Sequence, residues 1–316
     1  MQLSIGILMD DITTLKTWKD STFAMMLAAQ ARGHRIFYFQ QGDLFVEEGE
    51  AQVTAQQVTV TDQRKDYATL GEKETFPLSD FDAILMRKDP PFDMEYIYST
   101  YILEMAERKG TLVVNPPESL RRVNEKFFIS YFPELTPKTL ITRNMSRIRA
   151  FIDAERQAVI KPMDGMGGTG IFKMEKGGSN TGAILESLGN GNRTLMVQGF
   201  LPNVTQGDKR ILLVDGEAPA HGLARIPQGG EFRANLAAGG KGVTQALTQR
   251  EKEICAKVKP LIQQLGLMLV GLDVIDGHIT EINVTSPTCM REIAADSGED
   301  IAVRLIEAVE RKVAAR

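Results

Sequence analysis

The chain has 316 residues, of which 43% are hydrophobic and 25% are charged, and its formal net charge at pH 7 is -4. This composition is typical of a soluble globular protein, and a chain of this length usually divides into several domains. The negative charge argues against a nucleic-acid-binding protein, because affinity for the phosphate backbone needs a surplus of Lys and Arg. No apolar run approaches the length needed to cross a bilayer, so we expect no membrane partner either.

The first ten residues lack the basic segment, long apolar segment and cleavage site of a secretory signal, and they predict a strand instead. Cys255 and Cys289 show no C-x-x-C spacing, which argues against a disulfide framework and a zinc site. We therefore expect two buried thiols in a cytoplasmic protein. Three scattered histidines are expected to be structural or exposed: His34, His221 and His278.

The first third of the chain alternates apolar runs with amphipathic segments. The expected elements are strands at 3–9, 36–39, 83–86 and 111–114, and helices at 21–32 and 93–109 that each stop at a glycine. This order predicts an α/β domain with a doubly wound, mostly parallel sheet covered by helices. Ligands of such sheets lie beyond the carboxyl ends of the strands. Arg87 and Lys88 follow one such end, and Asn115 follows another.

A boundary is expected near Pro116 and Pro117, because consecutive prolines after a strand stop regular pairing; short helices follow. From about Lys138 the expected strands flank glycine loops. Asp215-Gly216 and Asp276-Gly277 are expected to form hairpin turns.

Two further helices are expected near the C-terminus. The segment 248–265 begins with the spacing of a capping box and places apolar residues on one face, although Pro260 should kink or interrupt it. The segment 299–314 is expected to form the last helix.

The glycine-rich segment 165–170 matches the spacing G-x-G-x-x-G of dinucleotide-binding folds. That fingerprint must open a helix, and the apolar run 171–174 meets Gly177 too soon for one; Ile171 also stands where a Walker A loop requires Lys. The segment therefore predicts a strand, a glycine loop and a second strand, with Lys161 ending the first. Such a hairpin covers phosphates with its backbone N–H groups. The alternative is a surface hairpin without a ligand.

The segment 270–284 carries Asp273, Glu281 and Asn283 on two apolar strands. Glu281 and Asn283 share a face, because side chains alternate along a strand. Asp273 joins them only if the turn spans three residues, so that it lies opposite Glu281; a two-residue turn would send it to the other face. Three converging oxygen donors suit Mg²⁺ better than zinc. The alternative is a solvated sheet face.

The segment 226–242 has neither helical nor strand periodicity. Long loops without regular structure are uncommon in compact domains unless they act as lids, and Arg233 would help to exclude water from a site below. The alternative is a disordered insertion. Arg210 and Arg225 lie on the strands before this loop, and guanidinium groups bind phosphate or carboxylate in a fixed fork. Their spacing alone does not distinguish them from surface arginines.

Four segments together resemble bacterial glutathione synthetases, a family of the ATP-grasp superfamily: 86–93, 161–168, 226–242 and 281–288. The resemblance covers essentially the whole chain. It implies an ATP-dependent carboxylate–amine ligase that phosphorylates a carboxylate of γ-glutamylcysteine and lets the amine of glycine displace the phosphate. It also implies an N-terminal substrate-binding domain (1–122), a central ATP-grasp lid (123–202), a C-terminal catalytic domain (203–316) with mostly antiparallel sheets, and a homotetramer.

The resemblance also implies roles for individual residues. The residues implied to bind ATP are Lys126, Lys161, Gly167, Gly168, Gln198, Leu201 and Asp208. Those implied to bind two Mg²⁺ ions, with Mn²⁺ as an alternative, are Asp273, Glu281 and Asn283. Arg210 and Arg225 would stabilise the transferring phosphoryl group and the tetrahedral intermediate. Those implied to recognise substrate carboxylates are Arg87, Arg233, Ser286 and Thr288.

Two positions depart from the family pattern. Ala234 follows Arg233 where a glycine is usual, and Gly199-Phe200 replaces a polar residue and tyrosine. The first change would slow or stiffen lid closure, and the second should matter little. Two rival functions are another ATP-grasp ligase, acting on amino acids or peptides, and a nucleotide-binding regulatory or scaffold protein without turnover. The scaffold would be expected to have lost Lys161 or a metal ligand, and all of these are present.

Overall fold

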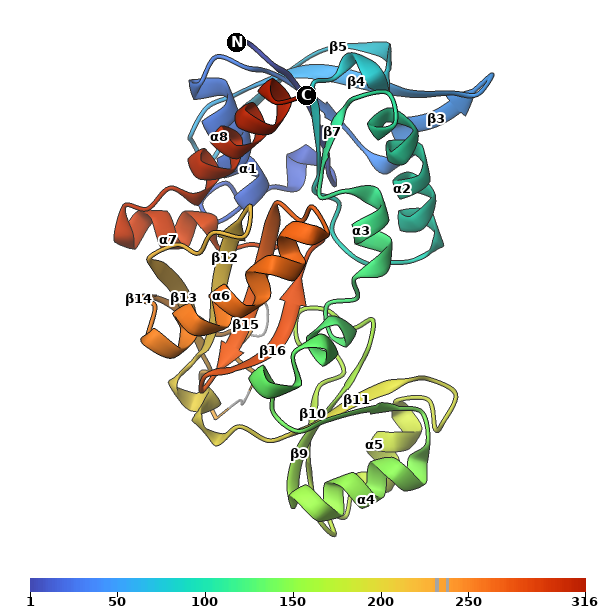
Figure 1. Ribbon diagram of the computed structural model, residues 1–316, viewed down its shortest axis with the longest axis vertical. Coiled ribbons are helices and arrows are strands. Elements are labelled where there is room, and N and C mark those ends of the chain that lie inside the picture. The colour runs from blue at the N-terminus through green and yellow to red at the C-terminus, as the bar shows by residue number, and fades with distance from the viewer. Residues whose placement is uncertain (231–232, 237–238) are drawn as a thin grey trace.

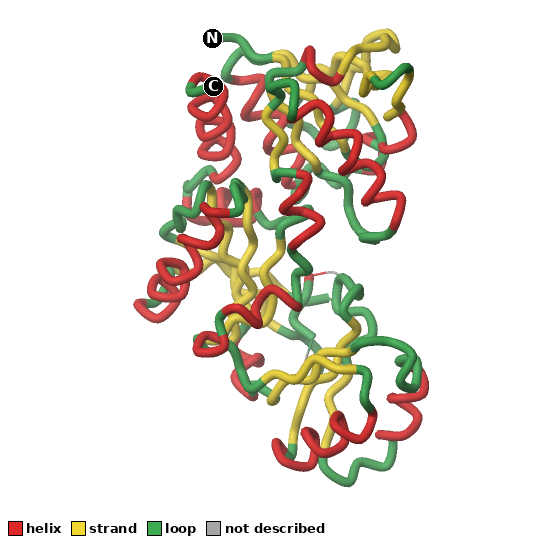
Figure 2. Tube along the Cα trace, turned by 45° about the vertical axis from the view of Figure 1, so that its right-hand side comes forward, coloured by secondary structure: helices red, strands yellow, loops and turns green. Residues whose placement is uncertain are grey.

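The computed structural model describes residues 1–230, 233–236 and 239–316. Three β-sheets of seven, four and five strands are arranged along its long axis, and the five-stranded sheet, last in the chain, lies between the other two (Figure 1). Figure 2 shows the three sheets as separate groups of strands, each with its own helices. No helix in the described part of the chain is both long and apolar enough to span a bilayer.

The first sheet is mixed. Its parallel part consists of β2 (Arg35–Phe39), β1 (Ser4–Leu8), β6 (Ala83–Met86) and β7 (Leu112–Val114), in that order. Its antiparallel part consists of β3 (Leu44–Glu47), β4 (Glu50–Val60) and β5 (Ala68–Pro77). The prediction of a mostly parallel sheet is therefore incomplete. These strands escaped prediction because β5 is largely exposed and an irregularity between Gln56 and Val58 breaks the alternation of β4.

The helices around the first sheet confirm the expected ones. α1 (Ser21–Ala31) and α8 (Ile301–Ala314) pack against each other in one hydrophobic core (Figure 1). α2 (Met94–Glu107) belongs to a second hydrophobic core. α3 (Pro117–Arg122) follows the predicted boundary. An aspartate caps each of the three long helices by accepting a bond from a first-turn N–H: Asp20, Asp93 and Asp300.

The second sheet is fully antiparallel, in the order β10-β9-β11-β8. Its strands are β8 (Thr139–Thr142), β9 (Gln157–Pro162), β10 (Phe172–Glu175) and β11 (Leu195–Gly199). α4 (Met145–Glu155) and α5 (Thr181–Ser187), which were not predicted, complete a separate small core with this sheet. The glycine loop joins β9 to β10, so the prediction of a strand, a loop and a strand is confirmed.

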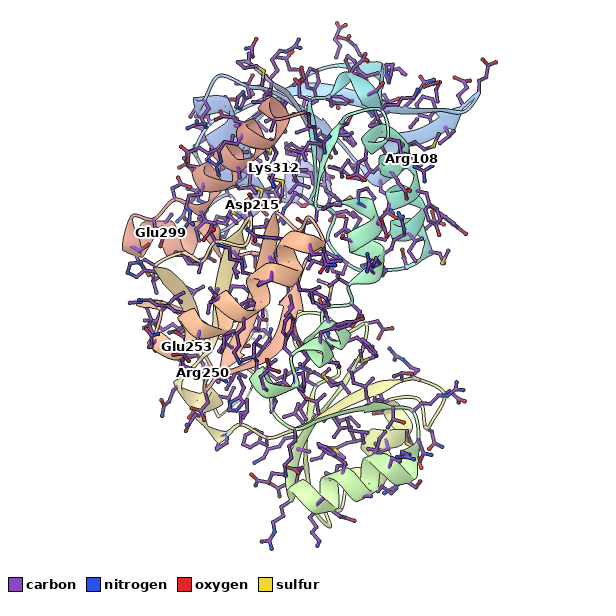
Figure 3. All side chains as sticks on the ribbon, in the orientation of Figure 1. Arg108, Asp215, Arg250, Glu253, Glu299 and Lys312 are labelled. Atoms are coloured by element: carbon purple, nitrogen blue, oxygen red, sulfur yellow. The ribbon has the colours of Figure 1, made fainter. Side chains whose placement is uncertain are left out.

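The third sheet is antiparallel as well, in the order β14-β13-β12-β15-β16. Its strands are β12 (Asp208–Val214), β13 (His221–Ile226), β14 (Lys241–Ala246), β15 (Leu269–Ile275) and β16 (His278–Asn283). Its helices are α6 (Gln249–Gln264) and α7 (Met290–Ser297). A tight turn at Asp215-Gly216 follows β12 as expected, and Lys312 of α8 lies 3.1 Å from the Asp215 carboxylate (Figure 3).

Helix α6 runs through Pro260, so of the expected kink or interruption the interruption is wrong. Thr248 and Glu251 form the predicted capping box at its start. Pro260 is exposed, whereas Ile254 and Ile262 are buried on either side of it. The continuous apolar face thus outweighs the single backbone hydrogen bond that a proline removes.

The β15–β16 hairpin has the predicted pairing of Asp273 with Glu281 but not the predicted turn. Its turn has two residues, Asp276 and Gly277, both with positive φ, because Ile275 pairs with His278. The three-residue turn that seemed necessary is therefore wrong. A bulge at Thr280 supplies the extra residue, so that Asp273 still lies opposite Glu281 and on its face.

Asn115 joins the first sheet to the third. Its amide donates to the carbonyls of Leu269 (2.8 Å) and Val284 (2.7 Å), and its Oδ1 accepts from the N–H groups of Met268 and Leu269. All four bonds are buried, so this strand end is fixed against the third sheet. The expectations of structural histidines and buried thiols hold for His34, Cys255 and Cys289.

Candidate active site

Two cavities meet between the three sheets, and Glu281 of β16 and Asn235 line both of them. The larger, of about 460 Å³, lies between the first and third sheets. The smaller, of about 90 Å³, lies between the second and third sheets. Residues far apart in sequence therefore border one continuous site with Glu281 at its junction.

The smaller cavity brings together most residues expected to bind a nucleotide. Of these, Lys161, Gln198, Leu201 and Asp208 line it, and they are joined by Arg233, predicted for substrate, and Glu281, predicted for metal. Apolar walls come from Val159, Ile171, Phe200 and Ile275. An apolar slot that ends at a lysine suits a flat heterocycle attached to an anionic tail.

Two lysines converge on Glu281 at the junction. The Lys161 ammonium lies 3.4 Å from Glu281 Oε1 and 3.2 Å from the Thr280 carbonyl, which the bulge presents. Lys126 lies 3.8 Å from the same oxygen, pairs with Glu125 and donates to the Gly165 carbonyl at 2.6 Å. Burial alone would raise the pKa of Glu281, but the two ammonium groups outweigh it and lower that pKa.

A chain of buried ion pairs lies on the same face of the third sheet. Asp273 accepts from Arg210 Nε at 2.5 Å and Nη2 at 3.0 Å, and Arg225 Nη2 lies 3.0 Å from its Oδ2. Arg225 also lies 2.6 Å from Asp208. Burial opposes ionisation of Asp273, yet both arginines outweigh it and hold its pKa well below the usual range. The two arginines are thus fixed in orientation where they border the larger cavity.

The oxygen donors predicted to hold a metal lie on this face too. Asn283 and Gly271 are opposite each other, as are Glu281 and Asp273. The Asn283 amide donates to the Gly271 carbonyl at 3.3 Å, which leaves its Oδ1 free to accept. Glu281 and Asn283 both border the larger cavity, whereas Asp273 lies beneath and uses both oxygens on arginines. The Glu281 carboxylate and the Asn283 amide oxygen are the kinds of donor that a hard divalent cation prefers.

The larger cavity brings together most residues expected to bind substrate. The predicted residues that line it are Arg87, Gly167, Arg210, Arg225, Glu281, Asn283, Ser286 and Thr288. Arg87 is buried, donates to Thr22 Oγ1 at 3.1 Å and to the Pro287 carbonyl at 3.0 Å, and has no partner for Nη1. An arginine held in this way presents a fixed donor to an anion.

The glycine loop and the long loop meet over the site. Arg233 donates to the Gly168 carbonyl at 3.3 Å. A Cβ at Gly168 would come within 3.1 Å of Asn235 Oδ1. Part of the predicted lid, at 231–232 and 237–238, lies outside the described residues. Arg233 and Asn235, which are described, border the smaller cavity as the lid prediction requires.

Sequence reasoning missed several charged residues that border the larger cavity: Asp10, Asp20, Asp89, Glu125 and Glu292. They follow no strand alternation or motif spacing, because they lie in loops and at helix starts. Only the pairing of Glu125 with Lys126, adjacent in sequence, offered a signal.

Two family models match the chain. The N-terminal domain of prokaryotic glutathione synthetase matches residues 3–121, and the ATP-grasp domain of the same enzymes matches residues 125–298. Glutathione synthetase of Escherichia coli K12 is 48% identical over 98% of this chain and 99% of its own. The Pseudomonas putida glutathione synthetase is 50% identical over 100% of both chains.

Solved structures with the same fold are more distant in sequence. The crystal structure of a D-cycloserine synthetase has a TM-score of 0.69 at 16% identity, covering 98% of this chain and 99% of its own. An ATP-grasp ligase complexed with a minimal precursor has a TM-score of 0.65 at 18% identity, with 98% and 99% covered. The likeness establishes the ATP-grasp fold.

Proposed function

We infer the roles of these residues from the premise that this chain belongs to the prokaryotic glutathione synthetase family. It is an ATP-dependent ligase that converts γ-L-glutamyl-L-cysteine and glycine to glutathione through an acyl phosphate, with release of ADP and phosphate. The observation that supports the residue roles best is the junction at Glu281, where the two cavities and two lysines meet.

We propose that the smaller cavity holds ATP. The adenine would lie against Gln198, Leu201 and the apolar walls, and Asp208 would lie near the ribose. Lys126 and Lys161 would leave Glu281 and bind the phosphates, because an ammonium loses little when it exchanges one anion for another. Gly167 and Gly168 would let backbone N–H groups approach the phosphate oxygens.

Glu281 and Asn283 are the residues we propose to hold the divalent metal, Mg²⁺ or Mn²⁺, at this junction. Asp273 belongs to the set by its register opposite Glu281, while it also orients Arg210 and Arg225. The bound metal would neutralise charge on the phosphates of ATP. Protein side chains contribute the remaining charge through the two lysines and two arginines.

The chemistry then needs two steps. The cysteinyl carboxylate attacks the γ-phosphorus of ATP, the bond to ADP breaks, and an acyl phosphate forms. The neutral amine of glycine adds to that carbonyl carbon, its nitrogen loses a proton, and the tetrahedral intermediate expels phosphate as the amide forms. Arg210 and Arg225 border the reacting end and would stabilise the negative oxygens in both steps. Their positions are fixed in advance by Asp273 and Asp208.

We propose that Arg87, Arg233, Ser286 and Thr288 recognise the substrate carboxylates that do not react. Arg87, Ser286 and Thr288 border the larger cavity, and Arg233 reaches across from the long loop to the Gly168 carbonyl. Closure of the two loops would exclude water, which would otherwise hydrolyse the acyl phosphate.

A phosphate-release assay with single omissions tests this function. The purified protein should release phosphate from ATP only when γ-glutamylcysteine, glycine and Mg²⁺ are all present. Release that ignores glycine, or that responds to D-alanine instead, would contradict the assignment and favour another ATP-grasp ligase.

Substitution of Glu281 by Gln tests the junction. It keeps the shape of the side chain but removes the charge that we assign to the metal, so phosphate release should become undetectable while the melting temperature shows a folded protein. Near-normal rates would remove Glu281 from the metal site.

We also propose the domain limits 1–122, 123–202 and 203–316, a cytoplasmic location and a homotetramer, as the resemblance implies. The two unpaired cysteines support a reducing compartment. Met94, Tyr98 and Tyr101 form a half-exposed stripe on α2, which supports an interface between subunits. Light scattering on the purified protein would give the mass of the assembly.

A further inference from the structure

One wall of the larger cavity is built where helices α1 and α7 begin. Ser21 accepts a bond from the Met290 N–H at 3.1 Å, which ties the first turns of the two helices together. Asp20, the cap of α1, and Glu292, in the first turn of α7, both border the cavity. Arg87 joins the same wall through its bonds to Thr22 and Pro287. Three charged side chains therefore share one rigid frame.

The two carboxylates are only partly satisfied by hydrogen bonds within the protein. Asp20 Oδ1 accepts from the Phe23 N–H at 2.7 Å, and Glu292 Oε2 is buried without a partner. In the described ranges no ion pair joins either carboxylate to a Lys, Arg or His. Lys19 is exposed at the rim, and Arg291 pairs with Asp62 at 2.9 Å. Burial raises the pKa of both carboxyl groups, which means that it disfavours their charged forms. A cationic ligand beside them would stabilise those charged forms.

Arg87, in contrast, has a hydrogen-bond donor without a partner. Its side chain is 4% exposed, it borders the cavity, and its Nη1 has no hydrogen-bond partner. A buried guanidinium N–H without a partner is costly, and an anionic ligand in the cavity would satisfy it. The charges of Asp20 and Arg87 interact, so a carboxylate that would bind a cation and a guanidinium that would bind an anion are neighbours. An α-amino acid zwitterion carries the matching pair of charges.

Glycine is a poor candidate for this subsite. Its amine must lose a proton before it attacks the acyl phosphate, and two carboxylates around it would hold the ammonium form. The γ-glutamyl end of the dipeptide keeps both its charges throughout the reaction. Of the two cavities of the site, Asp20, Glu292 and Arg87 border only the larger one, whereas the reacting carboxylate belongs at the Glu281 junction with the nucleotide.

We propose that Asp20 and Glu292 bind the α-ammonium group of the γ-glutamyl residue, while the neighbouring Arg87 binds its α-carboxylate. This subsite rests on the proposed function, since it describes how one substrate of that reaction is held. It assigns recognition of the substrate's amino group to residues from both ends of the chain.

The test compares γ-glutamylcysteine with its analogue that lacks the α-amino group, in wild type and in Asp20→Asn and Glu292→Gln. Asn keeps the helix cap at position 20, so the fold should survive. Each variant should raise KM for γ-glutamylcysteine by about tenfold or more, since a charge-assisted hydrogen bond is lost. KM for glycine and for ATP should stay within about twofold, and the analogue should be used equally well by wild type and variants.

Matched controls are Asp93→Asn, which alters the equivalent cap of α2, and Glu95→Gln, in the first turn of that helix. Neither residue borders either cavity of the site, and both variants should keep the wild-type preference for the amino group. The subsite is wrong if Asp20→Asn and Glu292→Gln weaken both dipeptides equally, or if KM for glycine rises instead. Failure of the proposed function is a separate result, because wild type would then release no phosphate with γ-glutamylcysteine and glycine.

Discussion

At the scale of single residues, the pKa values of two buried aspartates in one ion-pair chain shift in opposite directions. Asp273 touches two arginines, and its pKa is lowered although burial opposes ionisation. Asp208 shares Arg225 with Asp273, and its Oδ1 is buried without a partner. Burial therefore dominates, with the Asp273 charge adding to it, and raises the pKa of Asp208 to about 6.

The raised pKa of Asp208 predicts a pH-dependent loss of stability. Between pH 4 and 6 the unfolded aspartate has released its proton while the folded one keeps it, so the free energy of unfolding falls as pH rises. Asp208→Asn removes this titration. Urea unfolding from pH 4 to 6 should show wild type losing stability relative to Asp208→Asn, by on the order of 2 kcal/mol. A constant difference over that range would mean that Asp208 is ionised throughout.

The sequence predicted some site residues through physical reasoning and others only through resemblance. Strand alternation placed Glu281 and Asn283 on one face, and the glycine loop identified Lys161. Lys126 lies before a short 3₁₀ helix with no periodicity, so only the family pattern indicated it. The pairing of Asp208 with Arg225 follows from the register of β12 and β13, which propensities do not determine.

At the scale of elements, the β15–β16 hairpin positions the proposed metal ligands through a close backbone approach. Gly271 lies opposite Asn283, and a Cβ there would come within 2.9 Å of Pro287 and 3.1 Å of Arg210 Cδ. Gly271→Ala should therefore displace Arg210 while the sheet remains folded. We expect kcat to fall by tenfold or more, as small misplacements of positioning groups cost about 10²-fold.

Gly182→Ala is the matched control for this substitution. Gly182 lies in α5, its Cβ would meet nothing within 4 Å, and no positive φ is required. Activity should be unchanged and stability should rise by roughly 0.5–1 kcal/mol, because Ala favours helix. Full activity of Gly271→Ala would show that the contact with Arg210 relaxes without functional cost.

Elements with a clear apolar period were predictable, and those without one were not. Helices α1, α2, α6 and α8 were expected close to their observed limits. The β4–β5 hairpin was missed because most of β5 faces solvent and has no buried face to produce alternation. The two-residue turn at Asp276-Gly277 was predicted as a turn, but the compensating bulge at Thr280 has no sequence signal.

At the scale of the whole molecule, the last helix returns to the first domain. α8 packs beside α1 and also contacts β12, so it links the first domain to the third sheet (Figure 1). The sequence predicted the helix but not its position, since an amphipathic face does not specify its partner. Glu310 makes the main polar link, a two-bond contact with Arg32 at 2.7 and 2.8 Å and a contact with His34 at 2.8 Å.

Glu310→Gln should weaken this attachment in a pH-dependent way. Hydrogen bonds from Arg32 lower the pKa of Glu310 to about 2, so its contribution is present above pH 4.5 and is lost as pH falls through the folded value. Because the site is partly exposed, we expect a cost of only about 1 kcal/mol at pH 7 in urea unfolding. The cost should shrink steadily below pH 4.5. Glu307→Gln, which loses a single 3.2 Å contact with Arg32, should cost less than half as much. Equal costs for the two variants, or a cost independent of pH, would show that Glu310 does not hold α8 against α1.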